Sequence, residues 1–322
     1  MIQPRHIYNL HLDIVHGCQL RCVGCPNSTL LPKVKRIAIA DFATILRNID
    51  VEAVHTLRLF NFGEPLLHKD LPGILAEIPK QRWRAEVVEI STNAQHVDWP
   101  ALERALALNV LNRLVVSCDG DGTPAEYERL RPPSKWAKLI GFLERVRELR
   151  DRVSPDLQLV TRTISTRRSE RERWREVLEP RGWTPEFRGW MVLPESAKIM
   201  TGRDVQVPNG KCFFLADPHE FSGHPWHGEV RLLYVDYDGT VVPCCMHPQA
   251  GNFGNLKQQK YSEILSGMAR AAFIKHMESE RKSMAVCGSC EMGPVGNEGP
   301  SFWSVLDLVD DDVSAPATEA TA

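Results

Sequence analysis

The stretch "DIVHGCQLRCVGCPNS" (residues 13–28) places three cysteines, Cys18, Cys22 and Cys25, within eight residues. A cubane iron–sulfur cluster is usually held by cysteine thiolates, one on each iron. Three thiolates in one loop would leave one iron open to a small molecule that binds through nitrogen and oxygen. The alternative is a zinc site with His16 or a remote residue as fourth ligand. It fits less well, because zinc sites commonly pair two cysteines with a second, distant pair of ligands.

The composition is that of an ordinary globular protein. The 322 residues are 43% hydrophobic and 25% charged, with a net charge of −2, which leaves room for one large domain and a smaller one. No charge excess indicates a nucleic-acid partner, and no apolar run approaches the ~18 residues of a membrane span. The N-terminus has no signal-peptide pattern, so we expect a cytoplasmic protein. In that reducing compartment, clustered cysteines bind metal or do chemistry more often than they form disulfides.

Up to about residue 195, short apolar runs alternate with helical patterns. The helical patterns include 41–48, with Asp41 as a cap, 99–108 and 134–150. Strands are predicted at 9–14, 56–60, 86–90, 113–117, 157–163 and 186–192. Repeated strand–helix units form a parallel sheet with right-handed crossovers. The predicted fold is therefore α/β, a partial (βα)6 TIM-like barrel.

Polar motifs follow the predicted strands at the same end. The cysteines follow the first strand, and the later motifs are "NFGEP" (61–65), "STN" (91–93), "SCD" (117–119) and "TRT" (161–163). The carboxyl ends of parallel strands form one rim, where active sites of such folds are built. We therefore expect these motifs to form one site.

The pattern changes after about residue 211. Segments 230–234 and 240–243 read as a β-hairpin turned at Asp238-Gly239, and a helix is predicted at 262–280. The expected domains are the barrel at 1–200 and a small C-terminal α+β domain, a β-hairpin plus a helix, at 201–305. Residues 306–322 contain too few apolar side chains to pack, so we expect a disordered tail.

These features resemble the radical SAM superfamily, whose signature is the Cys18-x3-Cys22-x2-Cys25 spacing after the first barrel strand. The resemblance covers residues 8–195 and implies a [4Fe-4S] cluster that binds S-adenosyl-L-methionine (AdoMet) at its open iron. In that family, one electron from the cluster cleaves AdoMet to a 5′-deoxyadenosyl radical, which takes a hydrogen atom from the substrate. A reducing partner such as flavodoxin or ferredoxin is also implied, with no nucleic-acid or membrane partner.

The other motifs are similar to known elements of the family. Phe62-Gly63-Glu64-Pro65 resembles its "GGEP" element, which implies that Glu64 holds the methionine ammonium. "STN" resembles the element near the ribose and carboxylate, and Ser117 and Asp119 resemble a strand end that faces cofactor or substrate. Arg162 could bind a carboxylate of either molecule, or form a structural ion pair. The implied cofactor-binding residues are Gly63, Glu64, Ser91, Asn93, Ser117, Asp119 and Arg162.

The C-terminal cysteines resemble the SPASM/twitch extension of the same family. Its matching pieces are "GKC" (210–212), "DGTVVPC" (238–244), "GNL" (254–256) and "CGSC" (287–290). Nine cysteines are too few for two fully ligated auxiliary clusters, so the resemblance implies one auxiliary [4Fe-4S] cluster. Its ligands would be Cys212, Cys244, Cys287 and Cys290. A structural zinc site of four thiolates is the alternative.

Two cysteines are then spare. Adjacent strand residues point to opposite faces, so only one of Cys244 and Cys245 should reach the cluster, and the family's ligand follows the proline, as Cys244 does. Cys118 should be a buried small hydrophobe, since Ser117 and Asp119 occupy the other face of that strand. Cys245 is the better candidate for a catalytic hydrogen-atom donor.

The resemblance implies a radical SAM oxidoreductase that abstracts hydrogen from an unactivated C–H bond, in a dehydrogenation or an epimerisation. The predicted barrel begins within ten residues of Met1, without the leader-binding domain of many peptide-modifying members, which favours a natural-product-type small molecule. One alternative is a maturase of ribosomally made peptides. Another is a non-catalytic zinc or iron–sulfur scaffold or redox sensor, which would need neither Glu64 nor Asn93.

Overall fold

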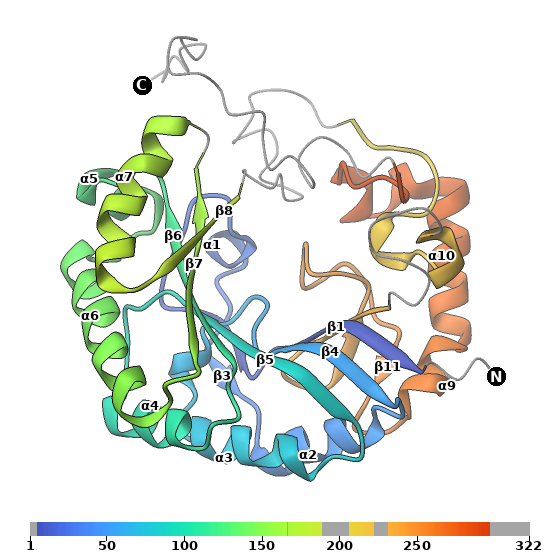
Figure 1. Ribbon diagram of the computed structural model, residues 1–322. Coiled ribbons are helices and arrows are strands. Elements are labelled where there is room, and N and C mark those ends of the chain that lie inside the picture. The colour runs from blue at the N-terminus through green and yellow to red at the C-terminus, as the bar shows by residue number, and fades with distance from the viewer. Residues whose placement is uncertain (1–4, 166, 189–205, 222–230, 297–322) are drawn as a thin grey trace.

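The computed structural model describes residues 5–165, 167–188, 206–221 and 231–296 (Figure 1). Within them, one curved sheet carries its helices on the outer, convex side. The six parallel strands of the barrel are β1 (His6–Leu12), β4 (Ala53–Arg58), β5 (Arg84–Thr92), β6 (Arg113–Asp119), β7 (Gln158–Ile164) and β8 (Thr184–Arg188). They lie side by side in chain order, each paired in parallel with the next. The predicted α/β partial barrel is confirmed.

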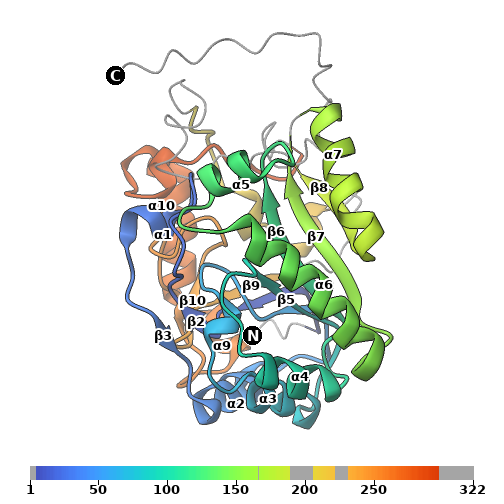
Figure 2. The same cartoon turned by 90° about the vertical axis from the view of Figure 1, so that its left-hand side faces the viewer.

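Helices follow the strands as right-handed crossovers require. In the barrel they are α1 (Pro26–Leu30), α2 (Ile39–Asn48), α3 (Leu71–Glu77), α4 (Trp99–Ala107), α5 (Pro124–Leu130), α6 (Trp136–Val153) and α7 (Arg168–Leu178). Both views place α6 outside β6 and β7 (Figures 1 and 2). Its buried face includes Leu139, Phe142 and Val146, which pack with Leu114 and Val116 in the main apolar core. The core therefore lies between sheet and helices and leaves the concave face free for polar side chains.

The C-terminal segment extends the same sheet. β9 (Leu232–Val235), β10 (Thr240–Val242) and β11 (Gly254–Asn255) continue it beyond β1, in the order β11-β10-β9-β1-β4-β5-β6-β7-β8. The predicted hairpin forms, with Gly239 at φ +90° in its turn. However, β9 pairs in parallel with β1, with Tyr234 opposite His11. A short separate ribbon joins β2 (Val15–His16) and β3 (Lys35–Arg36).

Some predicted boundaries are wrong. Helix α2 begins at Ile39 after the N-cap residue Ala38, so Asp41 is in the first turn, where its charge still favours the helix dipole. The predicted helix 262–280 is two helices, α9 (Tyr261–Leu265) and α10 (Met268–Glu280), because Gly267 takes an extended conformation as the N-cap of α10. β8 ends at Arg188, and residues 189–192 lie outside the described residues, as do the boundary at 200 and the tail 306–322. Among the described helices, none is long and apolar enough to cross a membrane.

Candidate active site

The three clustered cysteines lie in the loop between β2 and α1, at the carboxyl end of the barrel. Each is partly exposed, and Cys25 is the N-cap residue of α1. Burial raises the pKa of the Cys18 thiol to about 12, and the nearby Glu64, Cys22 and Cys25 raise it further. Three thiols this close cannot ionise together without positive charge between them, and a bound iron–sulfur cluster supplies that charge. The donor set therefore fits a cluster.

Glu64 joins two of the predicted motifs. It is buried, and its Oε1 accepts hydrogen bonds from the backbone N–H of Leu66 (3.0 Å) and the hydroxyl of Thr92 (2.6 Å). Its Oε2 accepts from the backbone N–H of Asn93 (2.8 Å). Burial raises the pKa of Glu64, and the bonds from Thr92 and Asn93 oppose that shift. The "GEP" loop after β4 is thereby fixed to the "STN" end of β5.

Asn93 extends this connection to the cysteine loop. Its Nδ2 donates to the Cys18 sulfur (3.3 Å), and its Oδ1 accepts from Gln19 Nε2 (2.9 Å). The backbone N–H of Leu20 also donates to the Cys18 sulfur (3.4 Å). Hydrogen bonds to ligating sulfur orient it and tune the cluster. Motifs from three strand ends therefore form one hydrogen-bonded unit.

Asp13 positions the loop that carries Glu64, and the sequence analysis did not identify it. Its carboxylate accepts from the backbone N–H groups of Asn61 (2.6 Å), Phe62 (3.0 Å) and Gly63 (3.3 Å). Burial raises the pKa of Asp13 to about 6, and these bonds oppose the shift. A Cβ at Gly63 would lie 1.5 Å from the carbonyl oxygen of Val15, so only glycine fits. The sequence does carry a signal for this role, because Asp13 is an acidic residue directly after the first strand and begins the stretch 13–28 that also contains the three cysteines.

Ser91, Ser117 and Asp119 lie on neighbouring strands. The hydroxyls of Ser91 and Ser117 are 3.4 Å apart. Asp119 is buried in an ion pair with Arg131, a residue that the sequence analysis missed. Burial raises the pKa of Cys22 to about 11, and Arg131 opposes the shift. Asp119 raises the pKa of Cys22 in turn, so the ion pair brings both a positive and a negative charge near the cluster thiols.

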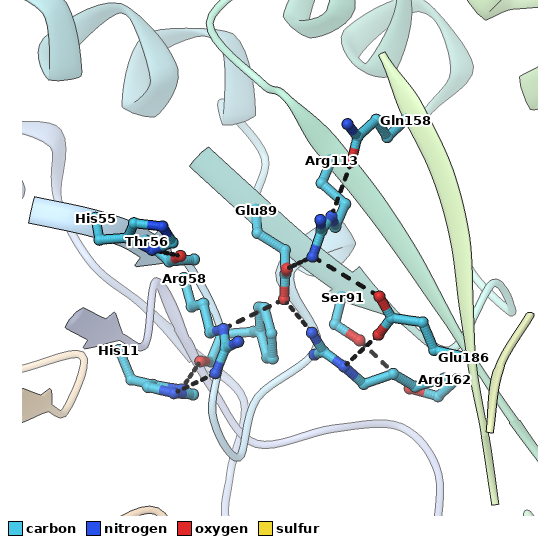
Figure 3. A network of polar contacts seen from close by, with 12 residues as sticks. His11, His55, Thr56, Arg58, Glu89, Ser91, Arg113, Gln158, Arg162 and Glu186 are labelled. Carbon is cyan, nitrogen blue, oxygen red and sulfur yellow. Dashed lines mark hydrogen bonds and ion pairs between the residues drawn. The ribbon is translucent and has the colours of Figure 1, made fainter. Parts of the chain in front are cut away.

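Arg162 forms an ion pair, one of the two roles considered for it. Its Nη2 donates to Glu89 Oε1 at 2.6 Å, in a charged network on the concave face of the sheet (Figure 3). Ser117 is its register partner on β6. Arg162 is therefore near the predicted cofactor residues, although its nearest partner is a carboxylate of this chain.

The four C-terminal cysteines proposed as auxiliary ligands are buried together. Burial raises the pKa of Cys212 to about 11 and of Cys287 to about 12, and in both cases nearby thiols add to the shift. Arg281, also missed from sequence, donates to the carbonyl oxygens of Cys287 (3.2 Å), Cys290 (3.1 Å) and Met292 (2.7 Å). Its Nη1 is buried without a hydrogen-bond partner among the described residues. An anionic cluster beside it would satisfy that group, so these residues fit an auxiliary cluster.

A structural zinc site of four thiolates is the alternative for these cysteines, because zinc takes the same four ligands. The two cysteines outside the proposed ligand sets lie in different environments. Cys118 is fully buried in the core, as predicted, while Cys245 is partly exposed and shares a hydrogen bond with Tyr234.

Comparison with known proteins identifies the class. The model of the radical SAM superfamily matches residues 12–179, and that of the SPASM iron–sulfur cluster-binding domain matches residues 227–291. The chain belongs to the radical SAM superfamily and carries a SPASM domain. These domains imply [4Fe-4S] clusters and AdoMet as cofactors.

Two curated relatives match part of the chain. The chain is 33% identical over 149 residues to GTP 3′,8-cyclase of Hydrogenovibrio crunogenus (45% of this chain, 44% of that protein). It is 30% identical over 115 residues to a probable GTP 3′,8-cyclase of Methanocella arvoryzae (36% and 35%). The matches span less than half the length of these curated relatives.

Solved structures share the fold over most of the chain. BtrN in complex with AdoMet and 2-DOIA has a TM-score of 0.52 at 15% identity, covering 92% of this chain and 98% of that one. Native anSMEcpe with bound AdoMet and Cp18Cys peptide has a TM-score of 0.57 at 14% identity, covering 95% and 93%. At such identities the likeness shows the fold alone.

Proposed function

We propose that this protein is a radical SAM oxidoreductase that acts on an unactivated C–H bond of a natural-product-type small molecule. The observation that supports it best is the hydrogen-bonded unit of Glu64, Asn93 and Cys18. A scaffold or sensor protein has no need of a buried acid fixed to a cluster ligand through one asparagine. An AdoMet-binding enzyme needs this arrangement, because the amino acid moiety of AdoMet and the cluster must be held in a fixed relation.

The chain's residues then have distinct roles. Cys18, Cys22 and Cys25 would hold the cluster with AdoMet, which on one-electron reduction supplies a 5′-deoxyadenosyl group that abstracts hydrogen. Glu64 would bind the ammonium of AdoMet. The remaining contacts to cofactor or substrate would come from Gly63, Ser91, Asn93, Ser117 and Asp119. An electron donor such as flavodoxin or ferredoxin would reduce the protein.

The C-terminal residues would decide between dehydrogenation and epimerisation. Cys212, Cys244, Cys287 and Cys290 would hold the auxiliary cluster, which can accept the second electron that a net dehydrogenation releases. In an epimerisation, Cys245 would instead return a hydrogen atom from its thiol to the substrate radical. One electron from the electron donor and one proton would then convert the resulting sulfur radical back to the thiol. The hydrogen bond between Cys245 and Tyr234, whose register partner is His11 of β1, supports a position beside the concave face.

A radical cyclisation is a second candidate. The relatives of 30–33% identity carry the name of a cyclase that acts on a nucleotide. A loss of two hydrogens from the substrate identifies dehydrogenation. Epimerisation and an internal cyclisation without other loss both leave the mass unchanged, and NMR of the product separates them, because only cyclisation forms a new ring bond.

The test is anaerobic incubation of the reconstituted, dithionite-reduced protein with AdoMet, followed by mass spectrometry for 5′-deoxyadenosine. Cys22→Ala is the control. Release that is absent from the control supports the proposal and justifies screening amino sugars, peptides and nucleotides for the mass changes above. A protein with full iron content that releases none, even with extracts of the source organism, would contradict it.

A further inference from the structure

The concave face of the barrel carries a cluster of arginines around one acid (Figure 3). Glu89 of β5 is fully buried, and Arg162 Nη2 lies 2.6 Å from its Oε1. Arg58 Nε is 3.4 Å from the same oxygen, and Arg113 Nη1 is 3.4 Å from Oε2. Three neighbouring strands thus contribute one arginine each to a single carboxylate.

The carboxylate of Glu89 cannot accept a hydrogen bond from every N–H group of these three arginines. Burial alone would raise the pKa of Glu89, but Arg162 and Arg58 lower it overall, so Glu89 is ionised and carries one negative charge. Three guanidinium groups carry many more N–H donors than the two oxygens of one carboxylate accept. A pair that served stability alone would need one arginine, because excess buried positive charge is costly.

Glu186, the second acid of the cluster, does not neutralise the excess positive charge. Glu186 of β8 lies 3.8 Å from Arg162 and 3.8 Å from Arg113, but it also pairs with Arg188 at 3.4 Å. Among the described residues of the cluster, four arginines therefore share two glutamates.

The positive charge of the arginine cluster also lowers the pKa values of neighbouring groups. Burial, then Arg58, holds the pKa of His11 well below its usual value, so His11 is neutral and its Nε2 accepts from Arg58 (3.2 Å). Burial, then Arg162, lowers the pKa of Arg58 itself. The two arginines thus repel each other, and an anion placed between them would relieve that repulsion.

The position suits a substrate group. Arg162 is the register partner of Ser117, whose hydroxyl is next to that of Ser91 in the proposed cofactor site. Arg58 lies close enough to Cys245 and Tyr234 to affect their pKa values. Both arginine side chains keep about a fifth of their surface exposed (22% and 20%), although Glu89 has none. A molecule held here would therefore lie between the proposed AdoMet residues and the Cys245 thiol.

We propose that Arg58 and Arg162 bind an anionic oxygen group of the substrate, a phosphate or a carboxylate. The planar guanidinium fork matches both groups in bidentate geometry. This inference rests on the proposed function, because it names the class of substrate for that site.

Calorimetric titration of the cluster-loaded, unreduced protein with inorganic pyrophosphate and with malonate tests it. At least one probe should saturate a single site with Kd below about 1 mM, and the stronger probe distinguishes phosphate from carboxylate. Arg162→Gln and Arg58→Gln should each weaken that binding about tenfold or more. Arg181→Gln is the matched control, since Arg181 pairs with Glu144 on the outer surface and should bind the probe as the wild type does. If Arg162→Gln fails to fold, Arg162→Lys keeps the charge, loses the fork, and should bind with intermediate affinity.

Three outcomes would overturn the inference. The first is that neither probe saturates the wild-type protein, and the second is that the control loses affinity as much as the arginine variants do. The third is that AdoMet affinity falls as far as probe affinity in Arg162→Gln, which would assign Arg162 to the cofactor. Release of 5′-deoxyadenosine by the wild type without any anion tests the proposed function separately, so the two hypotheses can fail independently.

Discussion

The side-chain amide of Asn93 donates a hydrogen bond to the sulfur of Cys18 at 3.3 Å, across 75 residues of chain. The backbone N–H of Asn93 donates to Glu64 at the same time. One residue at the end of β5 thus orients both a proposed cluster ligand and the proposed acid for AdoMet. The geometry of the site depends on strand ends that the barrel brings together.

Asn93→Ala should slow AdoMet cleavage about 10–100-fold, the usual cost of losing a hydrogen bond to a metal ligand. Loss of a donor to the thiolate should also make the cluster potential more negative, because the reduced cluster loses stabilisation. A redox titration followed by electron paramagnetic resonance measures this shift. Asn252→Ala, at an exposed position, is the control. An unchanged potential in Asn93→Ala would refute the role of this bond.

Cys244→Ala and Cys245→Ala should differ in iron content. Cys244 is buried near Cys212 and Cys290, which raise its pKa in addition to burial, so its loss should remove the auxiliary iron, half of the total. Cys245 bonds to Tyr234 instead, so its variant should keep full iron. Iron and sulfide assays on both proteins decide the assignment. The opposite result would make Cys245 the ligand.

Arg281→Ala should weaken the auxiliary site selectively. The side chain donates to three carbonyl oxygens of the loop that carries Cys287 and Cys290, and losing these bonds should cost about 3 kcal/mol in unfolding free energy. Auxiliary iron should be lost during gel filtration while the iron on Cys18, Cys22 and Cys25 remains. Lys282→Ala, at the exposed neighbouring position, should retain all iron. Equal loss from both variants would argue against the role of Arg281.

Asp236 should make stability depend on pH. Burial raises its pKa to about 8, and Asp13 and Asp238 add to the shift. An aspartate in the unfolded chain titrates near pH 4, so the native state holds an extra proton between about pH 4 and pH 8, and stability falls as pH rises through that window. From pH 6 to pH 9, Asp236→Asn should gain about 2–3 kcal/mol in unfolding free energy relative to wild type.

Denaturant titrations at the two pH values measure this gain. Asp156→Asn, at an exposed position, is the control and should follow the wild type. If the unfolding free energies of Asp236→Asn and wild type change equally between the two pH values, the Asp236 carboxyl ionises normally in the native state.

The sequence predicted the barrel because each strand is a local apolar run and each polar motif follows its strand directly. The contacts of Asp13, Arg131 and Arg281 were not predictable in the same way. Asp13 binds backbone N–H groups 48–50 residues away, and the backbone has no residue-specific pattern. Arg131 and Arg281 lie in segments that read as ordinary surface sequence. Their roles depend on how the loops fold around them.

Long-range pairing was the other feature missed. The hairpin was predicted from its own turn, Asp238-Gly239, but nothing local indicates that β9 pairs with β1. The arginine cluster illustrates the same limit. Arg58, Glu89 and Arg162 come from three strands, and the register that places them together appears only in the sheet.

The pairing of β9 with β1 makes the auxiliary segment a structural part of the barrel. Asp13 donates its backbone N–H to Val235 (2.9 Å), and Leu10 and Leu12 beside this seam are fully buried. During synthesis, β1 leaves the ribosome more than two hundred residues before its partner, so one side of it stays unpaired until the C-terminal segment emerges. An unpaired apolar strand edge promotes aggregation. A chain cut near residue 200 should therefore be prone to aggregate, and loss of the SPASM segment in evolution would require a new partner for β1.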